Sequence, residues 1–441
     1  MKSKDKISVI TLGCSKNTVD SERLLNQLKA NKFDLTDKPD YASTVIINTC
    51  GFIEAAKQES LDTILNAIEL KKQGRLKKVI VAGCLSERYV HELRKEIPDV
   101  DAYFGAEKYE GILNELGGEL KKELLGERLI TTPSHTAYLK ISEGCDHPCS
   151  FCAIPLMRGK HKSKPIDDLI REAEFLAANK TKELILIAQD TTDYGKDIYG
   201  KKVLADLLNK LSDIEGIEWI RLMYTYPSQF PDDVIEVIAG NPKICKYIDI
   251  PLQHISDNVL KSMRRGITGK RIRELLHKLK ERIPDITLRT TFIVGYPNEG
   301  EKEYEELCEF IKEIEFDRVG TFTFSIEENT PSFILGDPVP EKIKLKRRDI
   351  LMEIQKDISF RKNQSFINKR LNVLVENIEE DYYIGRSYRD APEVDGEILI
   401  SRKNDEVLPG NFYTAEVYDS NEYDLFANFV LNGRGKNESS N

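Results

Sequence analysis

Apolar runs and amphipathic stretches alternate along the first hundred residues. Helical patterns at 19–30 and 54–70 follow two of three short apolar runs, which lie at 6–12, 44–49 and 78–82. Each apolar run has the length of a buried strand, and strands that alternate with helices predict a parallel sheet. We therefore expect an N-terminal parallel-sheet α/β domain over residues 5–121.

A second series of strand–helix units follows the first. Six apolar runs, separated by helical patterns, lie at 137–142, 182–188, 219–226, 247–250, 287–294 and 318–325. Six such units predict a partial (β/α)6 barrel, in which chemistry gathers at the carboxyl ends of the strands. We expect this domain to span residues 131–362, ending in a basic helical connector at 341–362.

The pattern changes after residue 364 to short strands separated by turns. Turn signals at Asp395-Gly396 and Pro409-Gly410 accompany five short runs at 371–376, 382–386, 396–399, 414–417 and 425–430. Five short strands predict a small antiparallel β-barrel similar to the oligonucleotide-binding folds, over residues 364–432. We expect the polar tail at 432–441 to be disordered.

Composition and charge narrow the class of partner. The chain has 441 residues, of which 40% are hydrophobic, and this suits two or three globular domains. No apolar run approaches the roughly 18 residues of a membrane span, so no membrane is expected. The net charge is −9, and residues 364–441 hold 8 Lys plus Arg against 15 Asp plus Glu. Such an acidic last domain would repel phosphate and attract a basic protein, which argues against tRNA as a partner.

Three of the eight cysteines lie in one short loop, at Cys145, Cys149 and Cys152. This spacing suits a loop wrapped around a metal centre, and three thiolates on a cubane iron–sulfur cluster leave one iron open for a substrate or cofactor. Zinc is the weaker interpretation, because structural zinc takes four closed ligands and no second Cys-x-x-Cys pair is present. His147 lies inside the same loop as a possible fourth ligand. Three unligated thiols are the remaining alternative.

Three further cysteines, Cys14, Cys50 and Cys84, each follow a predicted strand of the first domain and lie beside a glycine. Ligands bind beyond the carboxyl ends of parallel strands, so we expect these cysteines to converge on a second three-cysteine cluster with an open iron. The alternative is that they are buried core thiols, as we expect for Cys245 and Cys308. Disulfides are not expected, because the thiols suit metal and no signal peptide is evident, so we expect a cytoplasmic location.

The pattern Cys-x-x-x-Cys-x-aromatic-Cys, with Phe151 as the aromatic residue, resembles the signature of radical S-adenosylmethionine (SAM) enzymes. The resemblance implies that SAM chelates the open iron and that the reduced cluster splits it into methionine and a 5′-deoxyadenosyl radical. It also implies that the loop after the second barrel strand contacts the SAM amino group. Here that loop begins with Gln189, although it departs from the common glycine-rich form. Arg221 and Arg289 could meet a carboxylate or form salt bridges within the barrel.

The whole chain resembles the methylthiotransferases, with a three-cysteine domain, a radical SAM barrel and a TRAM domain. Two branches of that family act on tRNA adenosines and a third acts on an aspartate of ribosomal protein uS12. The stretches that resemble the ribosomal-protein branch are 11–17 with 19–22, 48–53, 188–192 and 249–254. In the tRNA branch a glutamine more usually follows the first cysteine, and a serine–glycine–serine turn lies in the barrel. The tRNA adenosine 2-methylthiotransferases remain the alternative.

The resemblance also implies the cofactors and partners. Two 4Fe-4S clusters are expected, one on each cysteine set, and no catalytic residue beyond these ligands. One SAM would methylate a sulfur carried by the N-terminal cluster, and a second would provide the radical that takes a hydrogen atom from the aspartate β-carbon. Both clusters must then face one cavity. The expected partners are uS12, free or in the small subunit, a flavodoxin- or ferredoxin-type reductant, and a sulfide donor.

Two rivals come from other classes of protein. A two-cluster electron-transfer protein usually ligates every iron with cysteine, and six cysteines fall short of eight. A nucleotide-binding enzyme with structural zinc would need a Gly-x-Gly-x-x-Gly or P-loop pattern, and none follows the first-domain strands.

Overall fold

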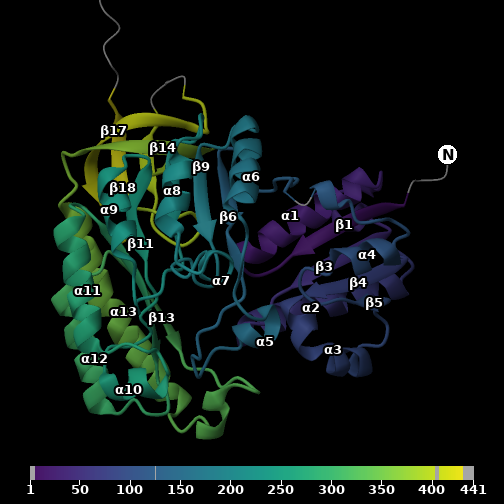
Figure 1. Ribbon diagram of the computed structural model, residues 1–441, viewed down its shortest axis with the longest axis horizontal. Coiled ribbons are helices and arrows are strands. Elements are labelled where there is room, and N and C mark those ends of the chain that lie inside the picture. Colours follow the sequence, from purple (N-terminus) through teal and green to yellow (C-terminus); the bar gives the residue numbers. More distant parts are fainter. Residues whose placement is uncertain (1–4, 125, 403–406, 431–441) are drawn as a thin grey trace, which may run out of the picture.

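A five-stranded parallel sheet forms the N-terminal part of the computed structural model, which describes residues 5–124, 126–402 and 407–430 (Figure 1). The strand order is β2-β1-β3-β4-β5. The bounds are β1 Lys6–Thr11, β2 Asp34–Leu35, β3 Thr44–Thr49, β4 Lys78–Gly83 and β5 Ala102–Tyr103. The two outer strands have two residues each, too few for an apolar run to predict them.

Helices cover both faces of this sheet. Leu24 and Leu28 of α1 (Ser15–Ala30) pack with Ile46 and Ile80 on one face, where α4 (Tyr109–Glu115) also lies. The helices α2 (Glu54–Lys72) and α3 (Cys84–Glu96) pack on the other face. The expected N-terminal α/β fold is confirmed.

The second sheet has six parallel strands in the order β13-β12-β11-β10-β9-β6, which confirms the partial (β/α)6 barrel. Its strands are β6 Thr136–Lys140, β9 Glu183–Ile187, β10 Trp219–Leu222, β11 Ile244–Asp249, β12 Thr287–Val294 and β13 Arg318–Thr323. The larger helices between them are α6 Ile166–Ala178, α8 Leu204–Ser212, α9 Asp232–Gly240, α11 Gly269–Arg282 and α12 Glu301–Ile314. Apolar side chains of these helices and strands form the largest core of the molecule.

Shorter elements cluster around the barrel and its connections. The paired strands β7 (Ser142–Glu143) and β8 (Lys162–Ser163) flank the Cys145–Cys152 loop together with α5 (Ile154–Arg158). The remaining short helices are α7 Lys196–Tyr199, α10 Asp257–Ser262, η1 Pro39–Tyr41, η2 Lys122–Leu124 and η3 Pro331–Leu335.

The C-terminal strands, which follow the long helix α13 (Glu341–Gln364) in the sequence, close into a five-stranded barrel. Its strands are β14 Arg370–Glu379, β15 Tyr382–Arg386, β16 Ile398–Ser401, β17 Asn411–Ser420 and β18 Leu425–Phe429. The expected small barrel is confirmed, and it closes through one parallel pair, β16 with β18, among antiparallel neighbours. The tail that we expected to be disordered, 432–441, lies outside the described residues.

The segment between β15 and β16 inserts against the inner face of the second sheet. Arg221, in β10, is ion-paired with Glu183 at 2.8 Å and donates to the carbonyl oxygen of Tyr388 at 2.7 Å. Arg289, in β12, pairs with Asp249 at 2.8 Å and lies 3.4 Å from Asp395. Both arginines therefore form salt bridges within the fold, which was one of the two roles that the sequence left open.

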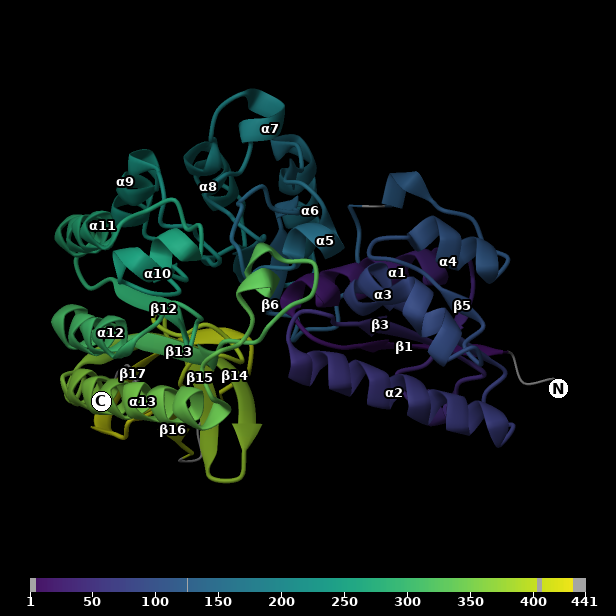
Figure 2. The ribbon, with the colours of Figure 1, turned by 90° about the horizontal axis from the view of Figure 1, so that it is seen from below.

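The N-terminal α/β domain lies beside the barrel formed by the second sheet (Figure 2). The segment after β13 extends toward the N-terminal helices, where Glu327 accepts from Lys57 at 2.9 Å and from Arg88 at 2.6 Å. All three side chains are largely buried, so these ion pairs tie α2 and α3 to the barrel. No helix in the described part of the chain is both long and apolar enough to cross a membrane.

Candidate metal centre

The first cysteine set lies at one edge of the N-terminal sheet. Cys14 caps α1 after β1, Cys50 follows β3, and Cys84 is the first residue of α3 after β4. Because β1 pairs with β3 and β3 pairs with β4 in parallel, the three strand ends are neighbours. Cys14 lies close enough to raise the pKa of both other thiols, and Cys50 also raises the pKa of Cys84. The sheet thus brings together residues that lie 36 and 34 positions apart in the sequence.

Close backbone packing shapes this site. Gly13 has φ of +88°, and a Cβ at this position would lie 2.8 Å from the Cys50 Sγ. Asn17 is fully buried, and its Nδ2 donates to the carbonyl oxygens of Leu12 at 2.8 Å and Thr49 at 3.0 Å. Asn17 therefore holds the loops that carry Cys14 and Cys50 at a fixed separation, and only glycine suits position 13.

The second set occupies the loop between β7 and α5. Gly144 has φ of +75°, and a Cβ there would lie 2.0 Å from the carbonyl oxygen of Lys160. The chain therefore turns tightly into Cys145, whose N–H donates to the carbonyl oxygen of Gly159 at 3.1 Å. This bond joins the two ends of the cysteine loop.

Burial raises the pKa of Cys50 and Cys84 in the first set and of Cys145 and Cys152 in the second. The pKa of Cys84 rises to about 11, and those of Cys145 and Cys152 rise to about 12. Neighbouring thiols act in the same direction. Thiols that stay protonated without a metal must release protons on binding one, so metal affinity depends on pH.

Hydrogen-bond donors face the sulfur atoms. Arg265 donates from Nη1 to the Cys149 Sγ at 3.3 Å, and Arg158 donates from Nε to the Cys84 Sγ at 3.1 Å. Backbone N–H groups also oppose the raised pKa of Cys145 and Cys152. Such N–H donors stabilise the negative charge of cluster-bound thiolates. The donor set and the glycine-lined cradle fit an iron–sulfur cluster at each cysteine set.

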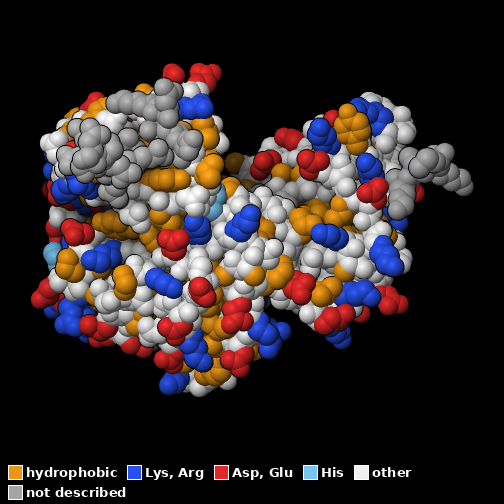
Figure 3. Space-filling model, turned by 90° about the horizontal axis from the view of Figure 1, so that it is seen from above, with side chains coloured by type: hydrophobic (Ala, Val, Ile, Leu, Met, Phe, Trp, Pro, Cys, Tyr) orange, Lys and Arg blue, Asp and Glu red, His pale blue; other side chains and the backbone are white. Residues whose placement is uncertain are grey.

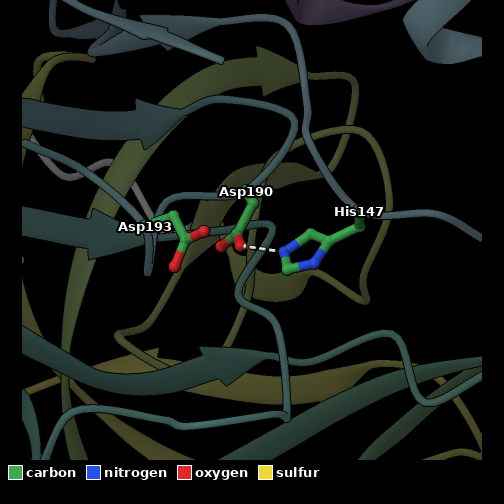
Figure 4. A group of neighbouring side chains, drawn as sticks. All are labelled: His147, Asp190 and Asp193. Carbon is green, nitrogen blue, oxygen red and sulfur yellow. Dashed lines mark hydrogen bonds and ion pairs between the residues drawn. The ribbon is translucent and has the colours of Figure 1, made fainter. Parts of the chain in front are cut away.

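His147 is directed toward another partner (Figure 4). Its Nε2 lies 2.6 Å from an Asp190 carboxylate oxygen, and its ring stacks on Tyr226 at a centroid distance of 3.6 Å. Asp193 lies nearby and pairs with Lys202 at 2.9 Å. These contacts account for the histidine without a place in the first coordination sphere of the thiols, so the zinc interpretation loses its fourth ligand.

The two cysteine sets lie beside each other. Cys84 packs in one apolar cluster with Ala153 and Met157, and Ala153 directly follows Cys152. Arg158, at the end of α5, contacts Cys84 across the same boundary. A cysteine of the first set and the residue next to Cys152 of the second therefore share one buried apolar cluster.

Gln189 follows β9, beside the second cysteine set. Its Nε2 donates to Glu143 Oε1, whereas its buried Oε1 has no hydrogen-bond partner among the described residues. An unpaired buried acceptor is costly, so a bound donor such as an ammonium group would satisfy it.

Three family models match successive parts of the chain. The description "Uncharacterized protein family UPF0004" matches residues 6–105, "Radical SAM superfamily" matches 139–311, and "TRAM domain" matches 367–430. A relative named ribosomal protein uS12 methylthiotransferase RimO, from Christiangramia forsetii, is 53% identical over 96% of this chain and 94% of its own length. The chain belongs to the radical SAM methylthiotransferase family. A relative of the same name from Aquifex aeolicus is 48% identical over 95% of this chain and 96% of its own length.

Solved structures of other radical SAM enzymes share the fold of this methylthiotransferase. The methyltransferase TsrM from Kitasatospora setae matches 86% of this chain and 79% of its own, with a TM-score of 0.55 and 12% identity. The cobalamin-dependent enzyme OxsB matches 80% of this chain and 56% of its own, with a TM-score of 0.52 and 13% identity. At such low identity these matches describe the fold alone.

Some residues of this methylthiotransferase site were not assigned from the sequence. They are the sulfur-contacting Arg158 and Arg265, the loop-bridging Asn17, and Tyr226, which lies between His147 and Cys149. Asn17 lies within a stretch that already resembled the family, so its position three residues after Cys14 was an available signal. Arg265 and Tyr226 are more than 70 residues from Cys149, and no local pattern marks them.

Proposed function

We propose that this methylthiotransferase adds a methylthio group to the β-carbon of an aspartate in ribosomal protein uS12. The observation that carries the proposal is identity of about 50% over essentially the full length to proteins named for that activity. The stretches at 11–17 and 249–254, which resemble the ribosomal-protein branch, agree with it.

We propose two 4Fe-4S clusters and SAM as cofactors. Cys145, Cys149 and Cys152 would hold the first cluster, and Cys14, Cys50 and Cys84 would hold the second. When bound, these groups supply a carbon radical and an activated sulfur, which side chains alone cannot provide at an unactivated carbon. Gln189 would accept a hydrogen bond from the SAM ammonium group through its unpaired Oε1.

The protein itself would shield the two sites from water and divide the proposed roles among its domains. The apolar contact of Cys84 with Ala153 and Met157 excludes water between the two sites, which protects a reactive intermediate. We assign these roles to three domains: 5–121 with the N-terminal cluster, 131–362 with the SAM core, and 364–432 as the TRAM-like barrel. A flavodoxin- or ferredoxin-type reductant and a sulfide donor complete the scheme.

The surface of the C-terminal barrel supports a basic protein substrate over RNA. Two of its few arginines are buried, because Arg386 pairs with Glu183 at 2.6 Å and Arg389 lies over the ring of Phe366. Acidic side chains therefore outnumber cations on the described barrel surface. On the part of the face in Figure 3 that the grey residues leave uncovered, charges of both signs are interspersed rather than gathered into a basic patch.

An anaerobic competition assay tests the proposal. Reconstituted enzyme receives SAM, sulfide and a reductant, with a uS12 loop peptide and bulk tRNA together, and mass spectrometry reads both. A methylthio mass gain on the peptide, absent when its target aspartate is replaced by alanine, is the expected result. A gain on tRNA alone would refute the proposed substrate and favour adenosine as the target. If both clusters are loaded and neither the peptide nor the tRNA gains mass, the proposed substrate and the tRNA alternative are both refuted.

A further inference from the structure

Arg158 is the one buried cation in the described chain whose guanidinium contacts a cysteine of the N-terminal set. Its side chain is 2% exposed. The Nε donates to the Cys84 Sγ at 3.1 Å, and Nη1 donates to Asp20 Oδ2 at 2.6 Å. The Nη2 donates to Asn17 Oδ1. All three nitrogen atoms are therefore used across the boundary between α5 and the N-terminal sheet.

These contacts reach all three loops of the N-terminal cysteine set. Arg158 contacts Cys84 directly. It is connected to the other two loops through Asn17, whose Nδ2 donates to the carbonyl oxygens of Leu12 and Thr49. These two residues come just before Gly13-Cys14 and Cys50. One side chain thereby fixes the position of the whole set relative to α5.

The same residue is tied to the second cysteine set. Arg158 Nη1 also lies 3.2 Å from Glu143 Oε2, and Glu143 accepts from Gln189 at its other oxygen. The carbonyl oxygen of Gly159, the next residue, accepts the N–H of Cys145. Arg158 thus lies between the two sites, bonded to the frame of each.

Arg158 stays cationic between two carboxylates. An arginine guanidinium is not deprotonated in proteins, and Asp20 and Glu143 pair with it at 2.6 and 3.2 Å. Lys140 shares both carboxylates, with its Nζ 2.6 Å from Glu143 and bonded to Asp20. The guanidinium therefore brings a permanent positive charge and an N–H donor to the Cys84 sulfur.

We propose that Arg158 is a positioning residue for the N-terminal cluster and raises the reduction potential of that cluster. A positive charge and an N–H bond at a ligand thiolate stabilise the added electron of the reduced cluster, so the oxidised form is more easily reduced. The inference rests on the proposed function only in requiring a cluster on Cys14, Cys50 and Cys84.

Potentiometric titration of the reconstituted full-length enzyme, followed by electron paramagnetic resonance, tests the inference without any substrate. The signal that changes on addition of SAM belongs to the radical SAM cluster, and the remaining signal belongs to the N-terminal cluster. We expect Arg158→Gln to lower the equilibrium constant for reduction of the N-terminal cluster at least tenfold, which is about 59 mV for one electron.

Two further variants make the result specific. Arg158→Lys keeps the charge but loses the fork that reaches sulfur, asparagine and carboxylate together, so we expect a smaller shift in the same direction. It also serves if the glutamine variant fails to load the N-terminal cluster. Arg88→Gln removes an equally buried arginine of the same boundary, bonded to Glu327 and to no cysteine. In Arg88→Gln, we expect the equilibrium constant for reduction of the N-terminal cluster to stay within twofold of the wild-type value.

The outcomes separate this inference from the proposed function. The role of Arg158 would be overturned if both Arg158 variants kept the equilibrium constant for cluster reduction within twofold of wild type. An equal shift in Arg88→Gln would also overturn it. Modification of tRNA instead of uS12 would change the proposed substrate and leave the titration intact. Iron for only one cluster in the wild-type enzyme would overturn both.

Discussion

Glu172 offers a direct test of how buried charges hold this molecule together. It lies in α6, is 3% exposed, and meets cations from three separate segments. One oxygen lies 3.2 Å from Arg23 of α1 and 3.0 Å from Lys164, and the other lies 3.1 Å from Arg128. Replacement of Glu172 by Gln removes the negative charge from this junction between the N-terminal sheet and the barrel.

The pKa of Glu172 sets the magnitude. Burial raises this pKa, but Lys164, Arg23 and Arg128 outweigh it and lower the pKa from 4.5 to about 2. One pKa unit corresponds to about 1.4 kcal/mol, so the ionised carboxylate contributes at most roughly 3 kcal/mol to the free energy of unfolding at pH 7. This is an upper figure because burial lowers the pKa of Lys164 to about 7, so Lys164 is only partly charged at that pH. A lowered folded-state pKa means that this stability is present above the unfolded pKa and is lost as pH falls toward the folded one. The contribution should therefore shrink by about 1 kcal/mol at pH 4 and by about 2 kcal/mol at pH 3.

Urea unfolding of the metal-free chain, followed by the fluorescence of its single tryptophan, Trp219, measures the effect. Glu172→Gln should be less stable than wild type by at most roughly 3 kcal/mol at pH 7, and the gap should narrow at lower pH. Asp168→Asn is the matched control on the same helix, because its pair with Arg171 is exposed and worth less than about 1 kcal/mol. A gap that stays constant from pH 7 to pH 3, or an equal loss in the control, would refute the reasoning.

Two substitutions test the N-terminal cysteine set. Cys84→Ala should halve the iron and acid-labile sulfide of the reconstituted enzyme and abolish methylthio transfer, while SAM cleavage persists. The control Cys245→Ala, which removes a buried cysteine of β11, should keep full iron. Loss of SAM cleavage in Cys84→Ala would contradict independent loading of the two sites. Gly13→Ala should also lower the iron content toward one cluster, because the added Cβ would lie 2.8 Å from the Cys50 Sγ. Gly117→Ala has a similar φ of +79° with nothing within 4 Å, so it isolates backbone strain and should keep full iron; equal iron in both variants would refute the steric argument.

Periodicity predicted the larger strands well because each is a long, buried apolar run. The run at 287–294 became β12 with the same bounds. The run at 219–226 was predicted too long, because β10 ends at Leu222 and Tyr224 adopts a φ of +58°. The residues after the strand stay apolar for another reason, since Tyr226 stacks on His147 beside the cysteines. Apolar character alone does not separate a strand from the wall of a site.

Each cysteine set was predictable for a physical reason of its own. The Cys145–Cys152 spacing is local, and the other set follows from the rule that parallel strands end at a common edge. Roles that depend on a distant partner were not predictable. Arg221 and Arg289 each lie on a predicted strand, but only the fold shows that Glu183 and Asp249 meet them.

The implied mechanism predicted that the two cysteine sets lie near each other, but the residues that hold them together were beyond the sequence. Buried charges contribute to this boundary, where Asp20 of α1 is bonded to both Lys140 and Arg158 of the barrel. The removal of one partner from such a buried pair costs about 3–5 kcal/mol, so sliding or opening of this boundary is strongly opposed. A boundary built this way suits a reaction in which the sulfur source and the radical source must keep one fixed separation.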